Sequence, residues 1–155
     1  ENQYNHQNVA SYAKELRDNG VSVHIGAHGQ REGLAAHWEL WIMEQGGFTP
    51  WEALRGGTID GAKHLGMGKD LGSIEKGKLA DLVVIDGDVL SDIRKSEYVE
   101  YTVLNGRVYE PATMNEVGSK EKREPFFFEQ DNATFMPQQT ADEVEAKAHH
   151  YHWEH

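Results

Sequence analysis

The feature that most constrains this chain is a helix, a strand, a loop and a second helix that follow one another within its first third. Apolar residues at helical spacing predict a helix over about residues 6–18, and Gly20 ends it. Alternating apolar residues predict a strand over 21–25, followed by a loop over 26–30 and a helix over about 33–45. Such a strand normally pairs in parallel with other strands. We expect those neighbours to lie outside this sequence.

Two shorter helices are predicted next. Thr49 and Glu52 have the spacing of a capping box, and Pro50 occupies the first helical position between them. This pattern predicts a short helix that runs through Leu54, and a further helical turn is expected after Thr58.

After Gly66 the pattern becomes that of β-structure. Residues 82–85 form a continuous apolar run, and residues 98–104 and 107–109 flank the dipeptide Asn105-Gly106. Because Asn-Gly is strongly favoured in two-residue hairpin turns, we predict a β-hairpin here. Beyond Pro111 the sequence is rich in Glu, Lys and Gln, which predicts an extended, solvated tail that docks through isolated aromatic residues.

Composition excludes several classes of function. A net charge of -11 and a pI near 5.2 argue against nucleic-acid binding, which needs a local excess of Lys and Arg. No apolar run approaches the roughly 20 residues needed to cross a bilayer, so we expect a soluble chain. The sequence has no cysteine, which removes disulfides and thiolate chemistry but leaves the compartment open.

Two stretches carry a specific resemblance: TIDGAKHLGMGKDLGSIEKGKLADLVVIDGDVLSDI at 58–93 and VEYTVLNGRVYE at 99–110. They resemble the C-terminal signature of the amidohydrolase superfamily. In that signature a Thr begins a helix carrying Ala and Leu-Gly, a Gly-Ser-Ile-Glu-x-Gly-Lys-x-Ala-Asp segment leads into a sandwich strand, and a hairpin closes with Asn-Gly. These are scaffold residues, so their match indicates ancestry and fold rather than chemistry.

The upstream segment 20–58 resembles the eighth barrel strand, its loop and the eighth helix of the imidazolonepropionase-like branch, particularly members fused to an N-terminal β-propeller. The resemblance implies an α/β plus β fold: the last βα unit of a TIM-barrel metal-dependent hydrolase with part of a composite β-sandwich. We therefore expect barrel elements over 1–66, sandwich strands over 67–112 and a tail over 113–155. Most of a usual ~250-residue barrel would lie outside the chain. A propeller-fused parent would make a periplasmic or secreted location possible.

The resemblance also implies a divalent metal, most simply zinc, held in the parent by histidines on earlier strands and by an Asp that ends the eighth strand. Where that family has a small or hydroxyl residue followed by Asp, this chain has Ala27 followed by His28. Imidazole binds the same metals and accepts a proton near neutral pH, so we predict His28 as a metal ligand and catalytic base. The alternative is a loop histidine bonded to backbone or water. Gly29, Gln30 and Arg31 are expected to line the same opening.

Other histidines have simpler interpretations. His37 and Glu39 point about 200° apart on a helix, so we expect them not to share a metal. We expect His37 to pack or bond beside Trp38 and Trp41. His24 faces away from the apolar strand positions and stays unassigned, and His64 is expected at the surface. The ending AHHYHWEH favours adventitious metal binding over a built site, although metal storage or sensing by the tail remains a weaker hypothesis.

Two hypotheses of function follow from the resemblance. In the first, the chain is the C-terminal part of a metal-dependent hydrolase that cleaves a C–N bond in a small-molecule or dipeptide-like substrate, and the part alone is inactive. In the alternative, His28 marks a non-catalytic binding or interaction module descended from such an enzyme. Because the predicted strand and apolar helix faces lack covering elements, we also expect self-association.

Overall fold

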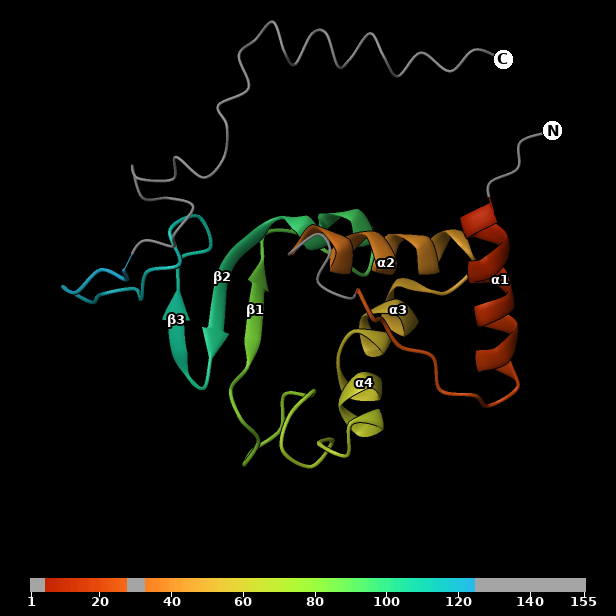
Figure 1. Cartoon of the computed structure of the whole chain (residues 1–155), viewed down its shortest axis with the longest axis horizontal. Coiled ribbons are helices and arrows are strands. Elements are labelled where there is room, and N and C mark those ends of the chain that lie inside the picture. Colours follow the sequence, from red (N-terminus) through yellow and green to blue (C-terminus); the bar gives the residue numbers. More distant parts are fainter. Residues whose placement is uncertain (1–4, 28–32, 125–155) are drawn as a thin grey trace, which may run out of the picture. The chain divides into compact units, whose positions relative to one another are not determined.

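A computed structural model describes residues 5–27 and 33–124 of the chain. Contacts divide the chain into two compact units, Glu1–Lys120 and Glu121–His155. All helices and strands of the described residues belong to the first unit, where a group of helices is followed by a small sheet (Figure 1). No helix among the described residues is long and apolar enough to span a membrane.

The helical part contains four α-helices, and the predicted helices are confirmed. They are α1 (Asn5–Asp18), α2 (Leu34–Gln45), α3 (Pro50–Gly56) and α4 (Ile59–His64). The α3 helix begins as expected, because the Thr49 side chain accepts a hydrogen bond from the Glu52 amide and the Glu52 carboxylate accepts one from the Thr49 amide. It extends two residues beyond the predicted end at Leu54.

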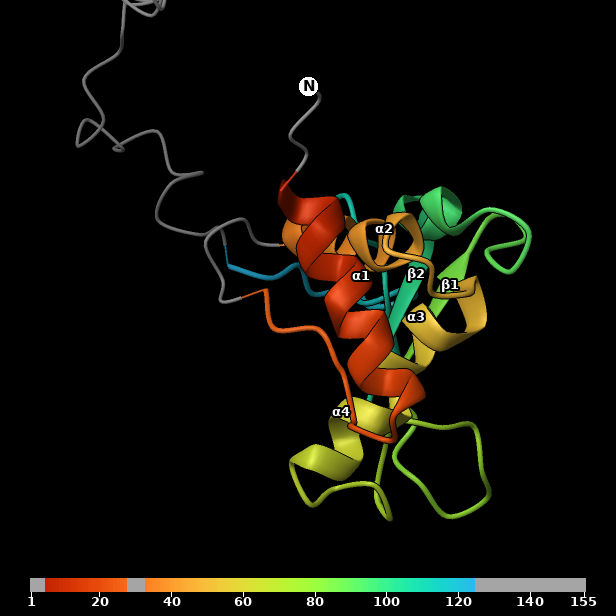
Figure 2. The same ribbon diagram turned by 90° about the vertical axis from the view of Figure 1, so that its right-hand side faces the viewer.

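The strand predicted over residues 21–25 is not formed, and this expectation was wrong for the chain by itself. Residues 21–27 follow the end of α1 and enter no sheet (Figure 2). Two backbone hydrogen bonds connect them to helices: the Val21 amide donates to the Leu16 carbonyl of α1 at 3.0 Å, and the Ile25 amide donates to the Gly56 carbonyl of α3 at 3.3 Å. The physical reason is that a strand needs a neighbouring strand for its backbone hydrogen bonds, and the described residues supply none beside this segment.

The core lies between the helices and the short 3₁₀ helix η1 (Ile93–Glu97). Val23 and Ile25 pack against this core from one side. Ile93 of η1 is fully buried, so the segment after β1 contributes directly to the helical core. The buried hydrophobic cluster consists of Leu40, Met43, Phe48, Ala53 and Ile93.

Close helix packing depends on glycine at two positions. A Cβ atom on Gly46, at the end of α2, would lie 2.4 Å from the Cβ of Ala10 in α1. A Cβ on Gly56 would lie 3.1 Å from the Met43 side chain and 3.3 Å from the Val23 carbonyl. Glycine therefore lets α1 approach α2, and lets the segment 21–27 approach the end of α3.

The sheet has three antiparallel strands in the order β1 (Leu82–Ile85), β2 (Val99–Leu104) and β3 (Arg107–Tyr109). The predicted hairpin is confirmed: Leu104 pairs with Arg107 across the turn, and Asn105 and Gly106 both have positive φ, at 49° and 79°. The expected β-sandwich needs a second sheet, and the described ranges 5–27 and 33–124 contain only this one.

The turn of the hairpin is anchored by the segment that precedes β1. The Asp81 carboxylate accepts a hydrogen bond from the Asn105 amide at 2.7 Å, and the Ala80 carbonyl accepts one from the Gly106 amide at 3.0 Å. These contacts explain physically why Ala-Asp and Asn-Gly occur together in one signature: one dipeptide holds the turn that the other forms.

The first part of the tail predicted beyond Pro111 folds back on the sheet around Glu116, which corrects the expectation of a solvated segment there. Glu116 forms an isolated antiparallel bridge with Tyr109 of β3. Its carboxylate also accepts a hydrogen bond from Arg107 Nε at 3.0 Å. Residues 125–155, including the aromatic and His-rich parts of the tail, lie outside the described residues.

Candidate functional site

The predicted site residue His28 lies outside the described residues, as do Gly29, Gln30 and Arg31. The structure describes the backbone up to Ala27, the residue directly before His28. Residues 21–27, which lead to His28, are held by side chains and backbone groups of the neighbouring helices.

Glu39 of α2 holds the end of this segment. Its Oε2 atom accepts a hydrogen bond from the Gly26 amide at 2.6 Å, two residues before His28. Together with the bond from Ile25 to Gly56, this contact attaches the segment both to α2 and to α3. Neither periodicity nor spacing in the sequence reveals this role of Glu39, because the contact joins residues 13 positions apart.

His37 and Glu39, which the sequence analysis expects not to share a metal, have separate partners in the structure. His37 Nδ1 lies 3.1 Å from the Ser96 hydroxyl, and its ring centroid is 6.5 Å from that of Trp41. The Trp41 indole N–H donates to the same hydroxyl at 3.0 Å and to the Ile93 carbonyl at 3.2 Å. Ser96 is buried, so this small polar cluster joins α2 to η1 as structure.

His24 and His64 contact one another through their rings. Their ring centroids are 4.2 Å apart with the planes tilted by 42°, which places the unassigned His24 against the C-terminal end of α4. His64 is exposed, as expected. No three His, Cys, Asp or Glu side chains within the described parts of the chain come together to hold a metal ion. The described residues alone therefore do not form a divalent-metal site, because such sites in hydrolases use three or more protein ligands.

A buried carboxylate joins three helices beside the segment 21–27. Asp60 of α4 is only 8% exposed. It accepts hydrogen bonds from Arg17 of α1 at 3.2 Å and from Arg55 of α3, whose Nε atom is 3.2 Å away. Glu52 of α3 extends the network, lying 3.5 Å from Arg17 and 3.8 Å from Lys14.

The charge of Asp60 is maintained by these arginines. Burial alone would raise the pKa of the Asp60 carboxyl, but the hydrogen bonds and charges of Arg55 and Arg17 outweigh burial and hold the pKa below its ordinary value. The Asp60 carboxylate is thus ionised at neutral pH and serves as a structural tie. The arrangement fixes α1, α3 and α4 around the backbone that leads to His28.

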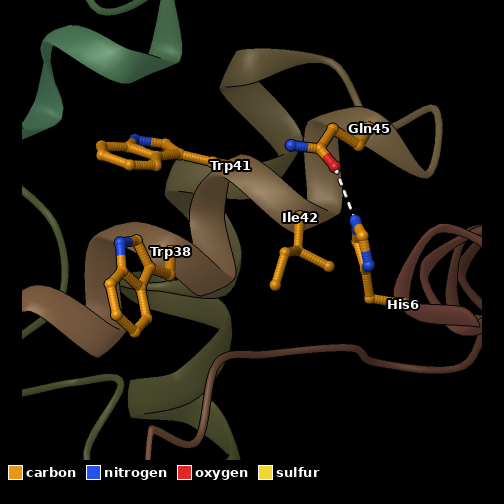
Figure 3. A pocket seen from close by; sticks show the side chains of 5 residues that line it. All are labelled: His6, Trp38, Trp41, Ile42 and Gln45. Atoms are coloured by element: carbon orange, nitrogen blue, oxygen red, sulfur yellow. Dashed lines mark hydrogen bonds between the residues drawn. The ribbon is translucent and has the colours of Figure 1, made fainter. Parts of the chain in front are cut away.

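An apolar pocket of about 380 Å³ lies between α1 and α2 (Figure 3). Trp38, Trp41 and Ile42 of α2 line it, together with His6 of α1, whose Nε2 atom lies 3.1 Å from Gln45 Oε1. Trp38 is 40% exposed. A large aromatic side chain left this accessible indicates a surface suited to cover by further protein.

The residues described so far form a small α/β fold, with a helical core and a three-stranded antiparallel sheet. Comparison with known proteins names the class. Residues 1–109 match the model of the amidohydrolase family. The chain belongs to the amidohydrolase family.

Individual relatives agree with this assignment. The chain is 38% identical over 69 residues to a 5-methylthioadenosine/S-adenosylhomocysteine deaminase of Thermoanaerobacter pseudethanolicus, covering 37% of this chain and 16% of that protein. It is 48% identical over 44 residues to an imidazolonepropionase of Thermoplasma volcanium, covering 28% and 11% respectively. Among solved structures, an Xaa-Pro dipeptidase with methionine bound in its active site matches with a TM-score of 0.61 and 31% identity over 66% of this chain.

The chain covers only a small share of each relative's length. The chain spans 25% of the dipeptidase chain and 16% and 11% of the two curated relatives. The match therefore assigns family and local fold. Activity and substrate belong to whole proteins, of which this chain corresponds to a part.

Proposed function

We propose that this chain is the C-terminal part of a metal-dependent amidohydrolase that cleaves a C–N bond in a small or dipeptide-like substrate, and that the chain alone is inactive. The observation that carries the proposal is the family match over residues 1–109. Two of the similar proteins, a deaminase and an Xaa-Pro dipeptidase, are named for reactions that break a C–N bond.

The unpaired segment 21–27 supports the proposed architecture. Val23 and Ile25 bury themselves against the helical core, yet the segment has no ladder partner among the described residues. This is the behaviour of a strand that packs on its own helices and takes its sheet hydrogen bonds from parallel neighbours in the rest of a barrel. In a completed barrel, the C-terminal end of this strand, where His28 follows, would open into the active site.

In this proposal the role of the chain is to position His28 against a divalent metal, most simply zinc, that ligands on earlier strands would hold. The metal would lower the pKa of a bound water and supply the nucleophile. The chain's own contribution is local: Glu39 and Gly56 fix the backbone at Gly26 and Ile25, and the Asp60 network fixes the helices behind them. His28 would act as ligand or as acceptor of the water proton.

The alternative function is a non-catalytic binding or interaction module of the same ancestry. The observation that favours it is the sequence Ala27-His28, where the resemblance leads one to expect a small or hydroxyl residue followed by Asp. Imidazole has no negative charge to offset a divalent cation, so replacing carboxylate by imidazole weakens the electrostatic part of metal binding.

The intact protein that contains this chain distinguishes the two functions. We expect it to release product from Xaa-Pro dipeptides or from small amides, to lose this activity when a chelator removes the metal, and to regain it when zinc is added. The changes His28→Asp and His28→Ala should both lower activity if His28 is a ligand or base. A rise in hydrolysis for His28→Asp would instead support the non-catalytic module.

The control for this test is His64→Asn. His64 is an exposed histidine whose ring contacts His24, and it is not one of the predicted site residues. It should leave hydrolysis and metal content unchanged. If the intact protein neither binds metal nor hydrolyses any C–N substrate, with correct folding shown by circular dichroism, the proposed hydrolase function is wrong.

A further inference from the structure

A second pocket, of about 530 Å³, lies beside α4 and the loop that follows it. Four of its lining side chains are cationic and only one is a carboxylate. Arg55 and Lys63 come from α3 and α4, and the loop contributes the rest. The polar side chains that line this pocket, called here the basic pocket, are Arg55, Lys63, Lys69, Ser73, Glu75 and Lys78.

The basic pocket is built around one ordered lysine. The Lys78 side chain is only 10% exposed. Its ammonium group donates to the Gly68 carbonyl at 2.8 Å and to the Ser73 hydroxyl at 2.5 Å, and it pairs with Glu75 at 3.2 Å. Lys78 thereby holds the loop in a fixed shape, so the other cationic groups are presented on a defined surface rather than on a random coil.

Local charge in the pocket opposes the charge of the chain. The whole chain carries -11, yet here Asp60 offsets Arg55 and Glu75 offsets Lys78, which leaves two positive charges. Those belong to Lys63 and Lys69, and neither makes an ion pair within the described ranges. The positive charge of Lys63 is stabilised by the C-terminal end of the α4 dipole. Lys69 lies in the loop beyond the helix, so the dipole does not stabilise its charge.

We propose that the basic pocket binds a small phosphate-type oxyanion. Lys63 and Lys69 bring two ammonium groups without an ion pair to the pocket, and such anions prefer several charged donors. Lys78 and Ser73 shape the site instead, because the Lys78 ammonium bonds Gly68, Ser73 and Glu75 and the Ser73 hydroxyl donates to Glu75 at 2.5 Å. The volume suits a small ligand. A nucleic acid is disfavoured because the net charge of -11 repels an extended polyanion outside the pocket. The inference concerns a binding site and does not depend on the proposed hydrolase function.

The experiment is a titration of the ¹⁵N-labelled 155-residue chain with inorganic phosphate at constant ionic strength and pH 7.5, followed by amide NMR shifts. We expect saturable shifts at Gly68, Lys69 and Ser73, with a dissociation constant on the order of 1 mM. Sodium chloride at the same ionic strength should produce no such saturation. A parallel titration with glycerol phosphate distinguishes an organic phosphate from the free ion, since the tighter of the two identifies the source.

The variant that tests the assignment is Lys63→Gln/Lys69→Gln, in which both positions are exposed and neither holds the loop. It should weaken phosphate binding about tenfold. The matched control, Lys76→Gln/Arg94→Gln, removes the same charge from residues that do not line the pocket, and should weaken binding less than about twofold. Equal weakening in the two variants, or equal shifts with chloride, would show screening of net charge and overturn the proposal.

A third variant keeps every charge. A Cβ atom on Gly68 would lie 2.7 Å from Lys63 Cγ and 3.3 Å from Lys63 Cα, so Gly68→Ala must displace the Lys63 side chain. We expect this change to weaken phosphate binding as well, with a folded spectrum elsewhere. Unchanged binding in both Gly68→Ala and the double lysine variant would contradict the proposal.

Discussion

The Glu39 carboxylate accepts a hydrogen bond from the Gly26 amide at 2.6 Å, so a helix side chain holds the backbone two residues before His28. The contact gives the Gly26 amide a hydrogen-bond acceptor where no neighbouring strand is present among the described residues. It does so just before His28, the residue assigned to the proposed chemistry. It also shows how a residue without any catalytic pattern can matter to a site by fixing the approach to it.

The change Glu39→Gln tests this contact. An amide oxygen is a weaker acceptor than a carboxylate, so we expect the Gly26 amide to lose about 1 kcal/mol of protection. Hydrogen exchange at Gly26 measures the effect. Glu44→Gln on the same helix is the control, because no side-chain contact of Glu44 is seen among the described residues, and it should leave Gly26 exchange unchanged.

The change Asp60→Asn should destabilise the fold. It leaves Arg17 and Arg55 without their shared carboxylate in a partly buried position, and we expect a loss of about 2 kcal/mol in the free energy of unfolding. Urea denaturation measures this loss. Asp18→Asn removes a surface carboxylate that pairs with Lys14 one turn away, and should cost less than about 0.5 kcal/mol. Similar losses for the two variants would refute the role given to Asp60.

The same carboxylate predicts a pH dependence. Because the pKa of Asp60 in the folded chain lies below its ordinary value of 3.8, its stabilising contribution is complete above that value. It is lost as the pH falls through the folded pKa, below about pH 4. The difference in unfolding free energy between the wild-type chain and Asp60→Asn should therefore shrink below pH 4, and a constant difference down to pH 2 would contradict the assignment.

Trp41→Phe should weaken the connection between α2 and η1. The change removes the N–H that donates to the Ile93 carbonyl and the Ser96 hydroxyl, both in a buried region, at a cost of about 1–2 kcal/mol. Thermal unfolding followed by circular dichroism measures it. Trp38→Phe is the matched control on the same helix, since Trp38 is 40% exposed and should cost less.

Self-association remains a prediction that light scattering can check. The apolar pocket of Figure 3 presents Trp38 and Ile42 at the surface, and the segment 21–27 lacks a ladder partner within the described residues. We expect the 155-residue chain to form dimers or larger species at high concentration, and Trp38→Glu to reduce them. Leu90→Glu, at another exposed apolar residue, should have no effect. A stable monomer at all concentrations would exclude the idea.

Local signals in the sequence predicted local structure well. The capping box at Thr49, the Asn105-Gly106 turn and the helical spacing before Gly20 each depend on residues close together in the chain, and the structure has all three. The strand over residues 21–25 failed for the opposite reason. Its alternating pattern is suitable for a strand, but a ladder requires a second chain segment that the pattern cannot supply.

The site was less accessible to sequence reasoning. The bond from Gly26 to Glu39, the arginines around Asp60 and the basic pocket all join side chains that only folding brings together. The net charge of -11 describes the whole chain, so it does not indicate that two lysines lie together at the end of one helix and in the loop after it. Position 28, chosen by resemblance, stays a prediction.

The order β1-β2-β3 has a directional consequence for growth of the sheet. Glu116 bridges to Tyr109 and occupies part of the outer side of β3. β1 is the other edge strand: among the described residues it pairs with β2 alone, which leaves the backbone groups of its outer edge without a ladder partner. An incoming strand therefore has one favourable edge on which to extend the ladder, and any polypeptide that completes this sheet must run alongside β1.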